Sequence, residues 1–62
     1  MKVKELIKLV ESAGWHLIRQ KGSHRQYHNL EKKGLVTIAG HQNDDVAPGT
    51  LNSVLKQAGI KK

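Results

Sequence analysis

One short segment, residues 19–25, combines positive charge, a glycine and a histidine. It contains three cations and one histidine but no carboxylate. In order, its residues are Arg19, Gln20, Lys21, Gly22, Ser23, His24 and Arg25. Glycine lets a phosphate approach the backbone, and successive N–H groups in a tight turn can bind an anion. The segment therefore predicts a phosphate-binding turn with His24 at its edge.

Such a turn would supply the groups needed to cleave RNA without a metal ion. A base takes the proton of a ribose 2′-hydroxyl, which attacks the neighbouring phosphorus, while cations stabilise the developing charge. We expect His24 to transfer the proton, because the imidazole of histidine titrates nearest to neutral pH. The groups expected to bind the phosphate are Arg19, Lys21, Gly22, Ser23 and Arg25. The alternative is an exposed hairpin turn whose charges serve only solubility.

Two other histidines are candidates for a second acid or base. His28 follows His24 by four positions, so both side chains lie on the same side of an extended strand. His41 follows the third predicted strand, residues 35–39, where an adjacent strand could bring it near His24. For both, a surface or structural role remains open, and His16 is expected to be structural or exposed. We expect no metal site and no cofactor, because no two histidines lie four positions apart on a predicted helix and no carboxylate lies close by to complete a ligand set.

The charge of the chain indicates a polyanionic partner. Its 62 residues are enough for one domain, residues 1–62, and carry 11 Lys and Arg against five Asp and Glu. The net charge of +6 indicates nucleic acid as the first candidate partner. An anionic membrane surface and an acidic protein are the alternatives. Lys61 and Lys62 would form a short basic tail that adds to this attraction. Trp15 and Tyr27 are too few to form a base-stacking platform, so we expect them to pack in the core.

Composition also limits where the protein acts. The chain has no cysteine, which excludes disulfides and thiolate metal sites. No apolar run is long enough for a transmembrane helix or the core of a signal peptide. We therefore expect a cytoplasmic protein that is not inserted in a membrane.

Two amphipathic helices are predicted, one before and one after the middle segment of the sequence. Apolar residues at the i, i+3, i+4 and i+7 positions predict a helix over residues 3–13: Val3, Leu6, Ile7 and Val10. The same spacing predicts a second helix from Pro48 to Ala58: Leu51, Val54, Leu55 and Ala58. Gly14 and Gly59 follow the helices as left-handed caps. Asp44 and Asp45 are expected to favour the positive end of the second helix.

Three strands are predicted between the helices. They cover residues 15–20, 24–30 and 35–39, with glycine-containing turns at 21–23 and 31–34. Short turns between consecutive strands favour an antiparallel meander. The predicted fold class is α+β in the order αβββα, with both helices on one face of a three-stranded antiparallel sheet. Double-stranded-RNA-binding domains use this layout.

Several short segments resemble the HicA toxin family in order and spacing, over residues 4–60. They are Gly14-Trp15, Arg19, Lys21 to His24, Thr37 to His41, Gly49 to Leu51 and Leu55 to Ile60. The resemblance implies a toxin of a toxin–antitoxin system, an endoribonuclease that cleaves mRNA, with a fold like that of a double-stranded-RNA-binding domain. It also implies that His24 is the active histidine and that a HicB-type antitoxin binds the toxin and blocks its site. The alternatives are a non-catalytic RNA-binding module of the same fold and a domain that binds an acidic protein.

Overall fold

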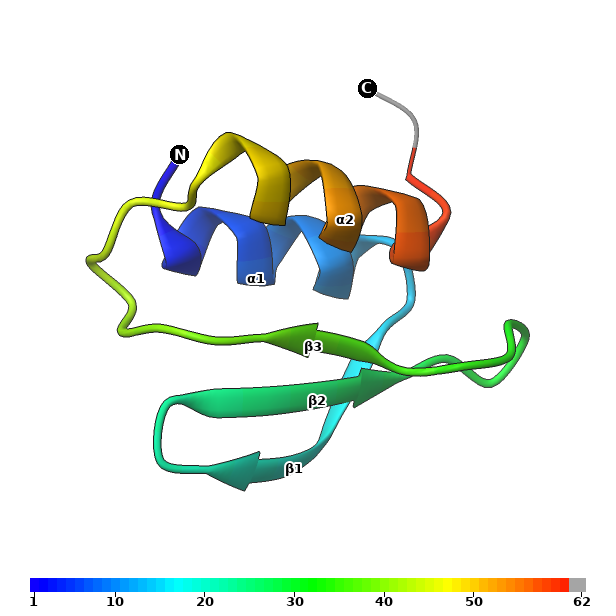
Figure 1. The fold of residues 1–62 in the computed structure, drawn as a ribbon. Coiled ribbons are helices and arrows are strands. Elements are labelled where there is room, and N and C mark those ends of the chain that lie inside the picture. The colour runs from blue at the N-terminus through cyan, green and yellow to red at the C-terminus, as the bar shows by residue number, and fades with distance from the viewer. Residues whose placement is uncertain (61–62) are drawn as a thin grey trace.

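A computed structural model describes residues 1–60 of the chain, so the basic tail predicted at Lys61 and Lys62 lies outside the described residues. The elements follow the order α1, β1, β2, β3, α2 (Figure 1). Their bounds are α1 Val3–Ser12, β1 His16–Lys21, β2 His24–His28, β3 Val36–Ile38 and α2 Pro48–Ala58. This is the predicted αβββα order, and the α+β fold class is confirmed.

The strands form one antiparallel sheet in the order β1-β2-β3. Lys21 pairs with His24, so Gly22 and Ser23 alone connect β1 to β2. Gly22 has a φ of 58°, a left-handed conformation that a tight two-residue hairpin uses and that glycine adopts without strain. The hairpin turn expected from the sequence is therefore present.

Strand β2 ends two residues earlier than the sequence indicates. The side chain of Asn29 accepts a hydrogen bond from the Glu31 N–H at 2.8 Å and donates one to the Ala13 carbonyl at 3.3 Å. Asparagine side chains that bond to the backbone two residues later stabilise turns in place of strands. The chain therefore leaves the sheet after His28.

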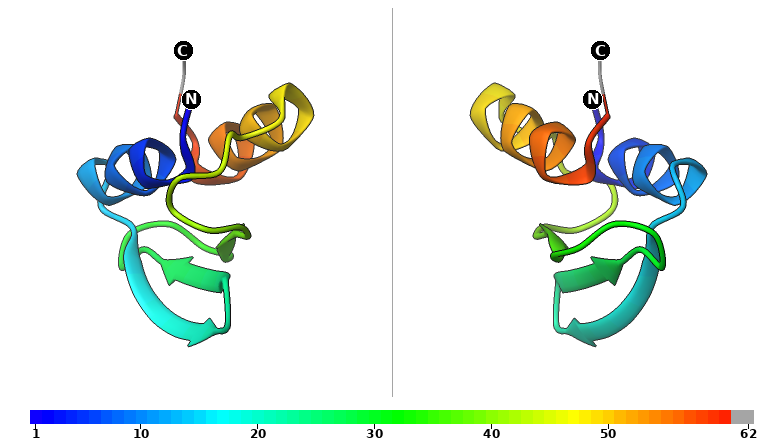
Figure 2. Two further views of the ribbon diagram at one scale, coloured as in Figure 1. Left: turned by 90° about the vertical axis from the view of Figure 1, so that its left-hand side faces the viewer. Right: turned by 90° about the vertical axis from the view of Figure 1, so that its right-hand side faces the viewer.

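Both helices lie on the same side of the sheet, side by side (Figure 2). They bury Val3, Leu6 and Val10 from α1, and Val54, Leu55 and Ala58 from α2. The sheet contributes Tyr27, Val36 and Ile38 to the same core. Trp15 is completely buried, and its Nε1–H donates to the Ala58 carbonyl at 3.1 Å. This hydrogen bond joins the C-terminal end of α2 to the start of the sheet. The expectation that Trp15 and Tyr27 pack in the core is confirmed.

The loop between β3 and α2 folds back over the start of α1. The Val3 N–H donates to the Asp44 carbonyl at 2.9 Å, and Asp45 forms a salt bridge of 2.9 Å with Lys2. The first turn of α2 contains no acidic residue. The expectation that Asp44 and Asp45 favour the positive end of α2 is therefore wrong, because the loop carries both aspartates to the other helix.

None of the described helices has the length and apolarity to span a bilayer.

Candidate functional site

His24 lies on the open face of the sheet, which the helices do not cover. It is the first residue of β2 and is exposed to solvent. Tyr27 is buried against the helices, and side chains alternate between the two faces of a strand. His24, Gln26 and His28 therefore face away from the core.

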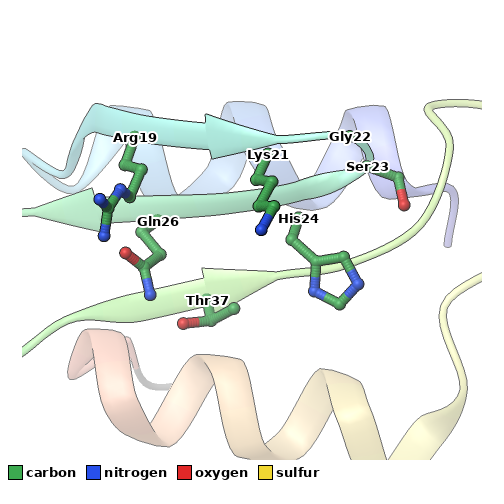
Figure 3. Close-up of a pocket in the computed structure, with 7 residues that line it drawn as sticks. All are labelled: Arg19, Lys21, Gly22, Ser23, His24, Gln26 and Thr37. Atoms are coloured by element: carbon green, nitrogen blue, oxygen red, sulfur yellow. The ribbon is translucent and has the colours of Figure 1, made fainter.

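An open pocket of about 810 Å³ lies in front of His24 (Figure 3). It is lined by residues from all three strands and from the β1–β2 turn: Arg19, Lys21, Gly22, Ser23, His24, Gln26 and Thr37. Across the strands, Lys21 stands opposite His24, while Gln26 lies between Arg19 and Thr37. Five of the six residues that the sequence assigns to catalysis or phosphate binding thus meet in one pocket.

A β-bulge in β1 places the two cations in this pocket. Leu17 pairs with Tyr27, but the next pair is Arg19 with Gln26, which leaves Ile18 as an extra residue. In a regular strand, Arg19 would share the core-facing side with Leu17, since the side-chain period is two. The extra residue reverses the alternation and turns Arg19 and Lys21 to the open face. The irregular register is thus the reason that both cations lie beside His24 and Gln26.

The pocket is positively charged. Arg19 and Lys21 line it, whereas no Asp or Glu does. Within residues 1–60, neither Arg19 nor Lys21 forms an ion pair, and the salt bridge in this part of the chain joins Lys2 to Asp45, outside the pocket. A phosphate entering the pocket would therefore meet cations that are not already neutralised by a carboxylate.

Arg25 does not line this pocket, unlike the other predicted phosphate-binding residues. Its guanidinium lies on the core-facing side of β2 and donates to the Gly40 carbonyl at 3.0 Å and the Ser23 carbonyl at 3.5 Å. Neighbouring residues of a strand face opposite sides, so Arg25 cannot share the open face with His24. The structure therefore does not bring Arg25 and Lys21 together around one phosphate.

The other candidate acid–base histidines also lie outside the pocket. His28 faces the same side as His24, but four residues of strand separate them by about 13 Å. The ring of His28 instead packs edge-on against that of His16, with 6.5 Å between centroids. His41 lies in the loop after β3, where its N–H donates to the carboxylate of Asp44 at 3.1 Å. Among residues 1–60, no cluster of three His, Asp or Glu side chains could hold a metal ion.

Two residues of the pocket were not expected from the sequence. Gln26 shares the open face with His24 because it lies two positions further along β2, so the alternation of the strand could have indicated it. Thr37 comes from β3 and is placed opposite Gln26 by the pairing of the two strands. No local pattern in the sequence specifies that pairing.

Comparisons with known proteins agree with this fold. The family model described as the HicA toxin of bacterial toxin–antitoxin systems matches residues 3–60. A chain of the solved HicA3 and HicB3 toxin-antitoxin complex is similar to this one, with 32% sequence identity and a TM-score of 0.82. That alignment covers 100% of this chain and 98% of the other. A search of curated proteins finds no match. Because the family model spans nearly the whole sequence and the fold agrees, the chain belongs to the HicA toxin family of bacterial toxin–antitoxin systems.

Proposed function

We propose that this toxin is an endoribonuclease that cleaves mRNA, with His24 as the catalytic residue. The observation that carries the proposal is the position of His24, exposed on the open face beside two cations and no carboxylate. Histidine transfers protons near neutral pH, and nearby cations stabilise a phosphate that gains charge. An mRNA substrate would place the activity in the cytoplasm.

The proposed reaction uses the ribose next to the cleaved bond as the nucleophile. The imidazole of His24 accepts the proton of the 2′-hydroxyl, and the 2′-oxygen forms a bond to phosphorus. The bond from phosphorus to the 5′-oxygen breaks, and water supplies the proton that this oxygen takes up. The products are a 2′,3′-cyclic phosphate and a free 5′-hydroxyl. Lys21 and Arg19 stabilise the charge on the phosphate oxygens during the transfer.

We also propose that a HicB-type antitoxin inhibits the toxin by covering the open face of the sheet. The similarity to a chain of the HicA3 and HicB3 complex supports a partner of this kind. The exposure of His24 supports inhibition by occlusion, since a protein bound over the pocket would exclude RNA from it. The open face is the part of the molecule on which RNA and antitoxin would then compete.

Cleavage of RNA by purified protein in excess chelator tests the proposal. His24→Ala should reduce the cleavage rate by about 100-fold or more, because a positioned acid–base group contributes that much. His16→Ala is a matched control, since His16 is also an exposed histidine of the hairpin but lies outside the pocket. It should cut at the wild-type rate. Circular dichroism should be unchanged in both variants, and thermal unfolding should show at most a small loss in His16→Ala, which removes the edge-on contact with His28.

Three results would contradict this proposal. Cleavage by His24→Ala at the wild-type rate would exclude His24 as the catalytic residue. Wild-type cleavage that stops in chelator would exclude the metal-independent reaction. RNA that is bound by the wild-type protein but stays intact would instead favour the non-catalytic RNA-binding module.

A further inference from the structure

Apart from Ser23 of the turn, the pocket on the open face contains two neutral polar side chains, Gln26 and Thr37 (Figure 3). Arg19, Gln26 and Thr37 form one row across the three strands. Neighbouring strands lie about 4.8 Å apart, and Gln26 is about 7 Å from His24 along β2. Both side chains therefore lie within reach of a nucleotide that flanks a phosphate at His24.

Within residues 1–60, neither side chain has a hydrogen-bond partner. The side-chain hydrogen bonds of this part of the chain all involve other residues. Gln20 offers a contrast, because its amide donates to the Gly22 carbonyl at 3.1 Å. The Gln26 amide, which is half-buried, keeps both its donor and its acceptor available for a ligand.

Hydrogen bonding is the means of base recognition that this face offers. Single-stranded RNA is usually read by stacking on aromatic rings or by hydrogen bonds to base edges. Trp15 and Tyr27 are buried, at 0% and 1% exposure, so neither can stack on a base, and the proposed reaction already assigns His24 and Arg19 to the phosphate and its proton transfer. The pocket instead presents an amide and a hydroxyl. A side-chain amide pairs in a bidentate manner with adenine, to whose amino group and ring nitrogen it is complementary.

We propose that Gln26 and Thr37 form a base-binding subsite that prefers adenine in the nucleotide next to the cleaved bond. This inference rests on the proposed RNA cleavage at His24. Gln26 makes the bidentate contact, and Thr37 adds a hydroxyl to the same base or its ribose. A bidentate pair of this kind discriminates against other bases by about 5- to 150-fold.

Mapping the cleavage sites in a mixed-sequence RNA tests the subsite. The wild-type protein should cut at sites enriched in adenine at one position next to the broken bond. Gln26→Ala should lose that enrichment, and Thr37→Val should weaken it. Gln20→Ala is the matched control, because this glutamine is bonded to the turn and does not line the pocket. It should keep the enrichment. No adenine enrichment in the wild type, or the same enrichment in Gln26→Ala, would overturn the subsite.

A binding measurement separates failure of the subsite from failure of the proposed cleavage. It uses His24→Ala protein and short oligouridine RNAs with and without one adenine. The adenine should increase affinity at least about fivefold, and adding Gln26→Ala should abolish the increase. That result supports the subsite even if the wild-type protein cuts no RNA, in which case the proposed cleavage alone fails. Equal affinity for the two RNAs overturns the subsite, whatever the cleavage assay shows.

Discussion

Replacing Arg25 and Lys21 separately by methionine should have opposite effects on stability and on RNA binding. The two cations flank the same turn but lie on opposite faces of the sheet. Arg25 is half-buried and donates to the Gly40 carbonyl at 3.0 Å. A hydrogen bond from a charged group contributes about 1.5–3 kcal/mol, and we take the lower value because water partly reaches this one. Methionine keeps a similar length but has neither donor nor charge.

The stability effect follows from the small size of the domain. Each kcal/mol shifts Tm by about 4–8 °C in a domain of 60–100 residues, so Arg25→Met should lower Tm by roughly 6–12 °C. Lys21 is exposed and, within residues 1–60, forms no ion pair. Lys21→Met should therefore change stability by less than about 0.5 kcal/mol. Thermal unfolding followed by circular dichroism measures both.

The RNA-binding effect should be the reverse. Each phosphate contact contributes about 0.7 to the slope of log K against log salt for a single strand. Lys21→Met should reduce the steepness by about that amount, whereas Arg25→Met should leave it unchanged. Fluorescence anisotropy with a labelled RNA at several salt concentrations, in protein that also carries His24→Ala, measures the slope without cleavage.

One result would refute the assignment of Arg25 to the core-facing side. If Arg25→Met reduces the salt slope as much as Lys21→Met and leaves Tm unchanged, its guanidinium contacts RNA. The phosphate-binding role that the sequence indicates for Arg25 would then hold.

Three further predictions concern the turn and the core. Gly22→Ala should lower stability by about 1–2 kcal/mol in thermal unfolding, because a residue with a Cβ is strained at a φ of 58°; an unchanged Tm would contradict the left-handed turn. Trp15→Phe should lower stability by about 0.5–1.5 kcal/mol in urea unfolding, since the Ala58 carbonyl loses its buried donor and keeps only the Lys32 Nζ at 3.3 Å; a cost near zero would argue against the Trp15 bond. Burial raises the pKa of Tyr27, so the contribution of its neutral form to stability should be complete below pH 10.0 and should be lost progressively as the pH rises above that value. Unfolding measured at increasing pH should therefore show a smaller loss of stability in Tyr27→Phe than in the wild type. Equal losses would exclude Tyr27 as the origin.

Local patterns in the sequence were sufficient for the architecture. The apolar stripes of the two helices, the glycines after them and the short turns predict the αβββα order that the structure has. These features depend on residues close together in the chain, through the periods of helix and strand and the conformations open to glycine. The clustering of charge around Gly22 and His24 is local too, and it indicates the turn at which the pocket lies.

The pairing of the strands decided which side chains share the pocket. Counting alternate residues from Leu17 would place Arg19 on the core-facing side, and only the bulge at Ile18 brings it to the open face. Alternation along β2 separates Arg25 from His24 although the two are adjacent in sequence. Thr37 reaches Gln26 only through the register of β3. A sequence specifies the spacing of side chains along each strand, but their face and neighbours depend on hydrogen bonds to other strands, and a single extra residue reverses them.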